Sequence, residues 1–231
     1  MNLDKRLTAA AHLVPVGARL ADIGSDHAYL PIALCLEGKI ECALASDINE
    51  GPVKAAVANI AANGLRKKVT AIRADGLDGA KSFEPTCITV LGMGGELIVS
   101  ILSRAKWIKD EKITLILQPM THPETVAYYL AENGFCIVDE SVVCENGRTD
   151  RAYRIIKAVF DGKVRNIDAA DAYVGRINLE RADNAVRTYA QRTVYFLQNK
   201  IEGKLRVGQD VSCEQDIVDQ IEKYIKQRTK I

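Results

Sequence analysis

The chain has no long apolar run and almost no net charge. Its 231 residues include 31 lysines and arginines and 30 aspartates and glutamates, so the formal net charge is +1. This balance does not indicate binding to an anionic membrane. Binding to a nucleic acid would need a local basic patch. No apolar stretch is long enough to span a membrane, and the charged residues 4–6 exclude a signal-peptide core at the N-terminus. We therefore expect a soluble, cytoplasmic protein and a monomer.

Patterns that bind metals or form disulfides are also missing. The six cysteines are scattered without a C-x-x-C pair, and several lie in apolar runs, which favours buried, reduced thiols. The three histidines, His12, His27 and His122, share no metal-ligand spacing with any cysteine. We expect no metal site.

Short apolar runs alternate with helical patterns over the first part of the chain. An amphipathic helix carrying Leu3, Leu7, Ala10 and Val14 comes first. The predicted strands are then 19–23, 41–47, 69–72, 87–91 and 113–117, and the predicted helices between them are 31–36, 52–63, 95–106 and 123–133. This alternation predicts a parallel sheet with right-handed crossovers.

Two further apolar runs, 135–144 and 152–160, are joined by Asn146-Gly147, which is a hairpin signal. A mostly parallel sheet with a late antiparallel hairpin is the outline of a class I, Rossmann-like methyltransferase, by analogy of fold alone.

The pattern changes after residue 160. Apolar residues at helical spacing form one stripe from Val174 to Leu197 and another from Ile217 to Ile225, separated by the breaker at 208–210. We therefore predict an α/β domain over residues 1–160 and a C-terminal antiparallel helical hairpin over residues 161–231.

The most informative segment is 22–31, where an apolar run ends in a glycine turn with two carboxylates. The corresponding G-x-G-x-x-G turn of dinucleotide folds lets the backbone close on a pyrophosphate. Here Asp26 stands at the second glycine position and Tyr29 at the third. An aspartate there would repel an anion but favour a sulfonium and its neighbouring ammonium. The predicted cofactor is S-adenosylmethionine.

Further cofactor candidates follow the next strands, because ligands of open parallel sheets bind at the carboxyl ends of strands. Asp47 can accept both ribose hydroxyls, Asp75 can accept from an adenine amino group, and Leu77 can cover the ring. Three glycines around Met93 allow close approach of the backbone. The complete set is Asp22, Gly24, Asp26, His27, Asp47, Ile48, Asp75, Gly76, Leu77, Gly92, Met93 and Gly94.

Several of these residues also have a structural interpretation. Asp22 and Asp75 can cap turns, which is common for aspartate near glycine. His27 can be a solvent-facing residue or a support for the turn, and the arginines of the tail can form a solvated face.

The segment after the fourth strand indicates the type of reaction by omission. It lacks the Asp/Asn-Pro-Pro-aromatic motif of amino methylation and the Pro-Cys pair of pyrimidine carbon methylation. The remaining type of reaction is methyl transfer to an atom that has its own lone pair, such as a ring nitrogen. Gln118-Pro119 places an amide where a base edge can be read, and Asp26 is the candidate catalytic residue, as proton acceptor from the methylated base.

These residues together resemble the TrmK family of bacterial tRNA methyltransferases. The resemblance covers nearly the whole chain and rests on segments 22–31, 49–52, 75–77, 92–95 and 115–119. It implies methyl transfer from S-adenosylmethionine to N1 of adenine 22 in tRNA, with a coiled-coil-like tail that helps to grip the tRNA. The expected substrate-binding residues are Tyr29, Gln118, Pro119, Arg176 and Arg187. Met120 departs from the asparagine expected after Gln-Pro, and we assign it no role.

Two other functions stay open at this point. A tRNA-binding module that has lost turnover is compatible with the near-zero net charge and with the lack of a compelling base. An NAD-dependent oxidoreductase is compatible with the alternating strands and Asp47, but Asp26 argues against it.

Overall fold

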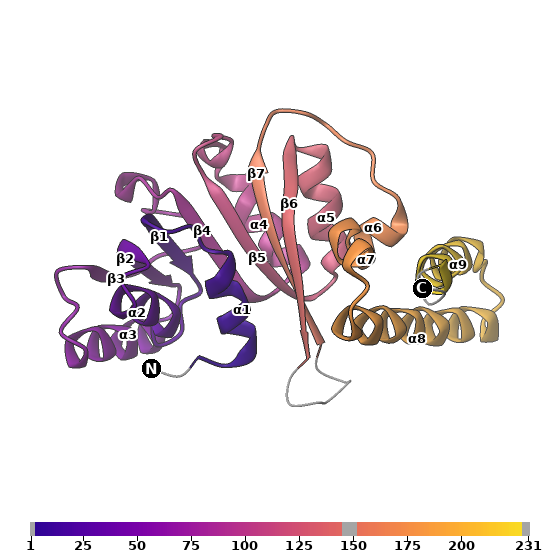
Figure 1. The fold of residues 1–231 in the computed structure, drawn as a ribbon, viewed down its shortest axis with the longest axis horizontal. Coiled ribbons are helices and arrows are strands. Elements are labelled where there is room, and N and C mark those ends of the chain that lie inside the picture. The colour runs from indigo at the N-terminus through magenta and orange to yellow at the C-terminus, as the bar shows by residue number, and fades with distance from the viewer. Residues whose placement is uncertain (1–2, 145–151, 228–231) are drawn as a thin grey trace.

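A computed structural model describes residues 3–144 and 152–227 of the chain. Seven strands form one sheet in the order β3-β2-β1-β4-β5-β7-β6 (Figure 1). They are β1 (Ala18–Ile23), β2 (Ile40–Asp47), β3 (Val69–Arg73), β4 (Cys87–Gly94), β5 (Thr114–Thr121), β6 (Phe135–Cys144) and β7 (Ala152–Phe160). The first five are parallel, and β7 is antiparallel to both β5 and β6. The predicted class I methyltransferase sheet is confirmed.

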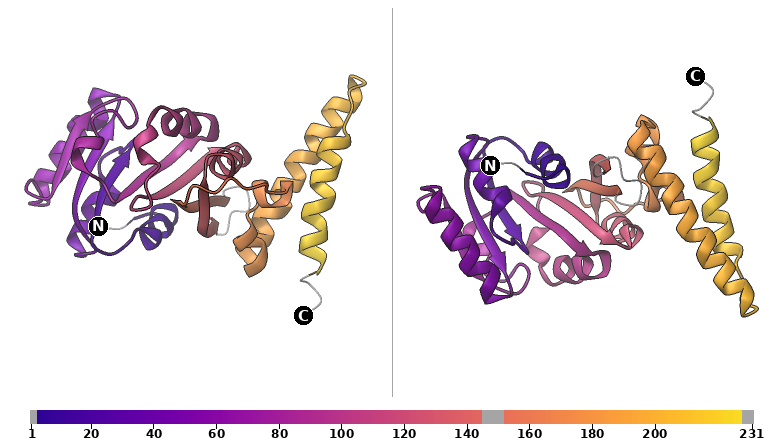
Figure 2. Two further views of the ribbon diagram at one scale, coloured as in Figure 1. Left: turned by 90° about the horizontal axis from the view of Figure 1, so that it is seen from above. Right: turned by 90° about the horizontal axis from the view of Figure 1, so that it is seen from below.

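Helices cover both faces of this sheet (Figure 2). They are α1 (Lys5–Leu13), α2 (Tyr29–Leu36) and α3 (Glu50–Ala62) on one face, and α4 (Gly95–Arg104) and α5 (Pro123–Glu132) on the other, with short 3-10 turns η1 (Lys81–Phe83) and η2 (Lys106–Ile108). The central strands β1, β4 and β5 are continuous apolar runs because helices on both faces bury most of their side chains.

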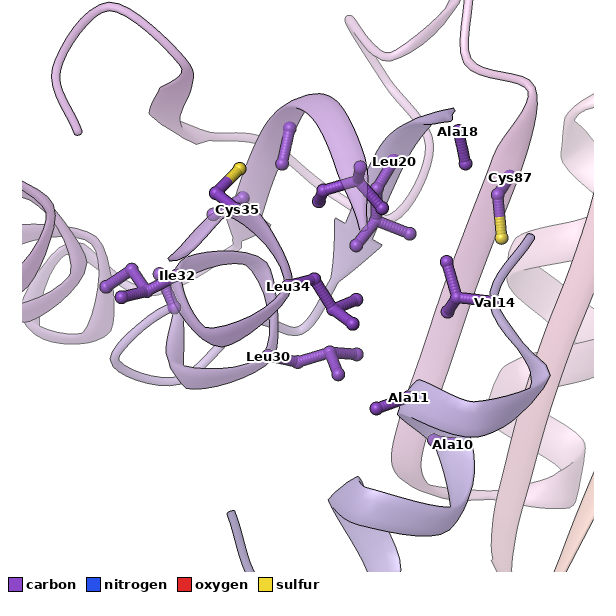
Figure 3. Close-up of a cluster of buried hydrophobic side chains, with 14 of the residues drawn as sticks. Ala10, Ala11, Val14, Ala18, Leu20, Leu30, Ile32, Leu34, Cys35 and Cys87 are labelled. Atoms are coloured by element: carbon purple, nitrogen blue, oxygen red, sulfur yellow. The ribbon is translucent and has the colours of Figure 1, made fainter. Parts of the chain in front are cut away.

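Alternation along each strand separates two apolar cores. Leu20 and Cys87 point toward α1 and α2, whereas Ala21 and Ile88 point toward α4 and α5. In the first core, Leu30 and Leu34 of α2 face Ala11 of α1 and Val14, which directly follows that helix (Figure 3). The first helix is thereby packed on the domain, as its apolar face predicts.

The predicted elements of this domain are present, but β4 and β5 are longer than predicted. The sequence places their ends at residues 91 and 117, whereas Met93 pairs with Pro119 and Gly94 with Thr121 after a shift in register. The pairing of β6 with β7 is as predicted, and the Asn146-Gly147 turn lies outside the described residues.

The tail begins differently from the prediction of one continuous stripe between Val174 and Leu197. It consists of α6 (Ala169–Tyr173), α7 (Arg176–Arg181), α8 (Asn184–Arg206) and α9 (Ser212–Gln227). Gly175, at φ +100°, and the side-chain cap of Asp183 interrupt the helical pattern. The hairpin itself is present, because α8 and α9 lie side by side (Figure 2) after the chain reverses at 207–211.

A buried ion pair joins the tail to the sheet. The side chains of Arg154 on β7 and Glu140 on β6 are each 1% exposed. Arg154 Nε donates to Glu140 Oε1 at 2.9 Å, and Arg154 Nη1 donates to the carbonyl of Ala172 at 2.6 Å. One guanidinium therefore binds Oε1 of a strand carboxylate and a carbonyl in the last turn of α6, while the buried Glu140 Oε2 has no hydrogen-bond partner among the described residues.

Replacing Arg154 by methionine should lower the free energy of unfolding by about 3–5 kcal/mol, because Glu140 would stay buried without its partner. The double variant Arg154→Met/Glu140→Leu should be more stable than Arg154→Met alone. Urea unfolding followed by circular dichroism measures both. Additive losses from the two substitutions would contradict this interpretation.

A second buried carboxylate, Glu214, holds α9 against α8. Its side chain is 6% exposed and lies 2.7 Å from Lys204 Nζ and 2.9 Å from Lys200 Nζ. Hydrogen bonds from Lys204 and Lys200 lower the pKa of Glu214 to about 2. A lowered pKa means that ionised Glu214 stabilises the hairpin above the ordinary pKa of 4.5, and this contribution is lost as the pH falls toward 2.

The variant Glu214→Gln should therefore lose about 1–3 kcal/mol of stability at pH 7. Its deficit against the wild type should narrow as the pH is lowered through 4.5. The control is Glu222→Gln on the same helix, which breaks an exposed pair with Lys226 and should cost roughly 0.5 kcal/mol or less. Denaturant unfolding at several pH values checks this, and a deficit independent of pH would exclude the assigned role.

Candidate functional site

The turn after β1, residues 24–28, is held tightly at the carboxyl ends of the parallel strands. Gly24 has φ +71°, and a Cβ there would lie only 2.1 Å from Met93 Cε. The N–H groups of Gly24 and Ser25 both donate to the Ser46 carbonyl, at 2.8 and 2.9 Å. The turn thus contacts the ends of β2 and β4, and the positive φ at residue 24 is a conformation that glycine adopts without strain.

Asp22 lies beneath this turn and is only 6% exposed. Its Oδ2 accepts from Ser25 Oγ at 2.5 Å, and its Oδ1 accepts from Thr89 Oγ1 at 2.6 Å. Burial raises the pKa of Asp22, against the opposing effect of these hydrogen bonds. Both oxygens are used inside the protein, which favours the structural interpretation: Asp22 supports the turn from below.

Asp26, His27 and Tyr29 form an exposed rim on the same turn. His27 Nε2 lies 3.2 Å from Asp26 Oδ1, and these side chains are 41% and 68% exposed. The His27 ring stacks on Tyr29, with ring centroids 5.2 Å apart and planes 12° apart. The Asp26 carboxylate is therefore open to a cationic ligand.

The end of β2 offers a different set of groups. Asp47 Oδ1 accepts the N–H of Asn49 at 2.7 Å, which fixes the carboxylate at the strand end. Ile48 is aliphatic but 55% exposed. Beside them, Ser46 Oγ is buried and has no hydrogen-bond partner among the described residues. The Asp47 carboxylate and the exposed Ile48 side chain fit the diol and flat ring of a nucleoside, whereas the Ser46 hydroxyl is enclosed in the protein.

Asp75, after β3, is paired with a residue that the sequence reasoning misses. Arg104 of α4 donates to both Asp75 oxygens, at 2.9 and 3.0 Å, and thereby lowers the pKa of Asp75. Each carboxylate oxygen has a second lone pair, so an amino group can still be accepted. Gly76 lies against Ile101 and Arg104. Leu77 is 5% exposed and packs in the core below α4, and not over an open surface as predicted.

Gln118 does not present its amide to an open site, in contrast to the prediction. It is 0% exposed, and its Oε1 accepts from Arg6 Nη1 at 3.1 Å and from the N–H of Gly92 at 3.0 Å. Its Nε2 donates to the Pro119 carbonyl at 2.9 Å. Because β5 continues past residue 117, Gln118 stays inside the sheet and holds Gly92 near the end of β4.

Arg6 is the second residue that the sequence reasoning misses. It reaches from α1 to the ends of β4 and β5, and its charge also acts on Asp22. The predicted packing of α1 on the domain was the single signal for it, because a lone arginine in a helix has no pattern that identifies its partner.

A cleft of about 380 Å³ lies between the end of β5 and α8. Its lining includes Pro119, Met120, Thr121, His122, Glu124, Arg154, Tyr173, Tyr189, Arg192, Phe196 and Lys200.

The two arginines predicted to bind substrate have other contacts. Arg176 Nη2 pairs with Asp171 Oδ2 at 2.6 Å, and Arg187 Nε donates to the Ala182 carbonyl at 3.0 Å. Within the described ranges, the cations that line the cleft are Arg154, Arg192 and Lys200, together with the titratable His122, and not Arg176 or Arg187. Arg154 is the buried partner of Glu140.

The described residues contain neither a helix that could span a membrane nor a cluster that could bind a metal. None of the helices there combines the length and apolar character that crossing a membrane requires. No cluster of three or more histidine, cysteine or acidic side chains in residues 3–144 and 152–227 could hold a metal ion.

The chain is similar to known methyltransferases. The methyltransferase domain family matches residues 3–156. The tRNA (adenine(22)-N(1))-methyltransferase of Bacillus subtilis is 38% identical over 148 residues, which are 64% of this chain and 62% of that protein. The aligned part thus spans less than two thirds of the relative's length.

Two solved structures are similar over nearly the whole chain. A candidate tRNA (m1A22) methyltransferase of Streptococcus pneumoniae, in complex with S-adenosyl-L-methionine, is 31% identical with a TM-score of 0.84, covering 97% of this chain and 100% of that one. TrmK of M. capricolum, in complex with S-adenosyl-homocysteine, is 25% identical with a TM-score of 0.76, covering 97% and 98%. The chain therefore belongs to the methyltransferase domain family and, within it, to the TrmK family.

Proposed function

We propose that this protein transfers the methyl group of S-adenosyl-L-methionine to N1 of adenine 22 in tRNA. The observation that carries this proposal is the likeness to the S. pneumoniae structure, which extends over 97% of the chain and so includes both the sheet and the helical tail. The B. subtilis relative is named for the same reaction. In this proposal residues 1–160 bind the cofactor, residues 161–231 help to grip tRNA, and the protein acts as a cytoplasmic monomer.

The strand ends fit this cofactor. Gly24 lets the backbone approach closely, and Asp26 presents an exposed carboxylate to positive charge. Asp47 is placed to accept from ribose hydroxyls, and Ile48 offers an apolar surface to the adenine ring. When bound, S-adenosyl-L-methionine supplies a methyl group on a positively charged sulfur.

The acceptor needs little help from a base. N1 of adenine has its own lone pair, which forms the new N–C bond as the S–C bond breaks, so the positive charge passes to the base. The protein's main contribution is then position, at the ends of β1 and β4. Asp26, 68% exposed at the rim of the turn, is proposed to offset that charge and to accept a proton from the methylated base.

The direct test uses unmodified tRNA and S-adenosyl-L-methionine with a labelled methyl group. The wild-type chain should label N1-methyladenosine at position 22, identified by mass spectrometry of the nucleosides. A tRNA with guanine at that position is the control and should stay unlabelled. Label on N6 or on the protein would contradict the proposal, and tRNA binding without any label would identify a binding module instead.

The variant Asp47→Ala should weaken cofactor binding by about 1–3 kcal/mol, through the loss of hydrogen bonds to the ribose. Asp110→Ala is a matched control, because Asp110 accepts the N–H of Lys112 at 2.9 Å in the same type of turn but precedes β5, at the opposite edge of the sheet. Calorimetry measures both affinities. Equal affinities for Asp47→Ala and the wild type would exclude the ribose assignment.

A further inference from the structure

The cleft between β5 and α8 contains aromatic and cationic side chains that the methyl-transfer site does not use. Phe196 of α8 is 55% exposed, and the Arg192 guanidinium lies 5.2 Å from its ring centroid. Tyr173 and Tyr189 also line the cleft. An exposed ring beside a guanidinium is a platform on which a nucleobase can stack.

The charges in the cleft suit a phosphate. Arg192 Nη1 donates to the Ala152 carbonyl at 3.2 Å, and no described carboxylate lies within ion-pair distance of it. Lys200 is 57% exposed, although Glu214 is 2.9 Å from its Nζ. Glu124 on the opposite wall lies 3.1 Å from His122 Nδ1, a contact that is an ion pair only when the imidazole is protonated. Arg192 is thus the cation in this cleft whose charge is least compensated.

The volume and the position also fit a nucleotide. A cleft of about 380 Å³ is at the lower end of the range of roughly 300–1,000 Å³ found for small-molecule sites. Its wall at Pro119 and Met120 directly follows Gln118, which contacts Gly92 at the end of β4. RNA that delivers a base to the ends of β1 and β4 would therefore pass this cleft.

The chemistry of the proposed reaction supplies the occupant. N1 lies on the Watson–Crick edge of adenine, so the target base must leave its stack before the methyl group can reach it. A neighbouring nucleotide then loses a stacking partner, and an aromatic side chain can replace it.

We propose that the cleft between β5 and α8 binds one unpaired nucleotide of the RNA substrate, with its base stacked on Phe196 and its phosphate beside Arg192 and Lys200. This inference rests on the proposed tRNA substrate and deepens it, because it assigns a site for a nucleotide other than the one methylated.

The test is the affinity for unmodified tRNA, measured without methyl transfer. Phe196→Leu keeps an apolar side chain but removes the ring, and it should raise the Kd for tRNA roughly 5- to 50-fold. Tyr195→Leu is the control for loss of an exposed ring from α8: Tyr195 is 61% exposed and does not line the cleft, although its ring centroid lies 6.1 Å from that of Phe196. It should change the Kd less than about twofold. Unchanged affinity for S-adenosyl-L-methionine verifies that the variants are folded.

A second pair of variants distinguishes the effect of a positive charge in the cleft from that of a positive charge elsewhere on α8. Arg192→Gln and Arg206→Gln remove the same charge from α8, but Arg206 is 79% exposed and outside the cleft. Arg192→Gln should weaken tRNA binding more and should reduce the salt slope by about one.

A spectroscopic readout locates the nucleotide. The fluorescence of 2-aminopurine placed next to adenine 22 should be lower in the complex with the wild type than in the complex with Phe196→Leu, because the variant leaves this base without a stacking partner. Wild-type tRNA affinity in Phe196→Leu, or equal losses in Phe196→Leu and Tyr195→Leu, would overturn the inference. If the inference fails in this way but the wild type still methylates N1, the proposed function stands. If tRNA binding depends on Phe196 but no methylation occurs, the inference is supported and the proposed function is contradicted.

Discussion

The position of the helical tail depends on the buried pair between Arg154 and Glu140. A guanidinium that is 1% exposed needs a partner for each donor, and Arg154 finds them on β6 and on the last turn of α6. A Cβ at Gly175 would lie 2.2 Å from Glu140 Oε2. The position between α6 and α7 therefore has room only for glycine. These constraints place α8 beside the end of β5, and the cleft exists because of that placement.

The proposed cofactor site depends on a different constraint, the parallel pairing of β1, β2 and β4. Neighbouring parallel strands end at one edge, so Gly24, Asp47 and Met93 come together although they are distant in sequence. This part of the site can be predicted from the sequence. Each of these residues follows an apolar run, and the length of the run determines where the strand ends.

Other features could not be predicted because they depend on contacts between distant side chains. Arg6 meets Gln118 across 112 positions, and Arg104 meets Asp75 across 29, with no periodicity that connects either pair. Gln118 is interior because β5 continues past residue 117 and pairs Gln118 with Leu91 of β4, which local propensity does not report. The break in the tail at Gly175 likewise reflects Glu140 and not the helical pattern around it.

The net charge of the chain is near zero, and most cations near the cleft are likewise paired with a carboxylate. Binding of RNA there would therefore not rely on long-range attraction. Arg176 forms an ion pair with Asp171, and Arg154 forms one with Glu140. Lys200 and Lys204 share Glu214. Such pairs give little long-range attraction for a polyanion. Arg192, which the described part of the chain leaves without a carboxylate, acts at short range beside the Phe196 ring. Recognition of RNA at this cleft would therefore depend on an unstacked base as much as on phosphate, and a continuous duplex would gain little there.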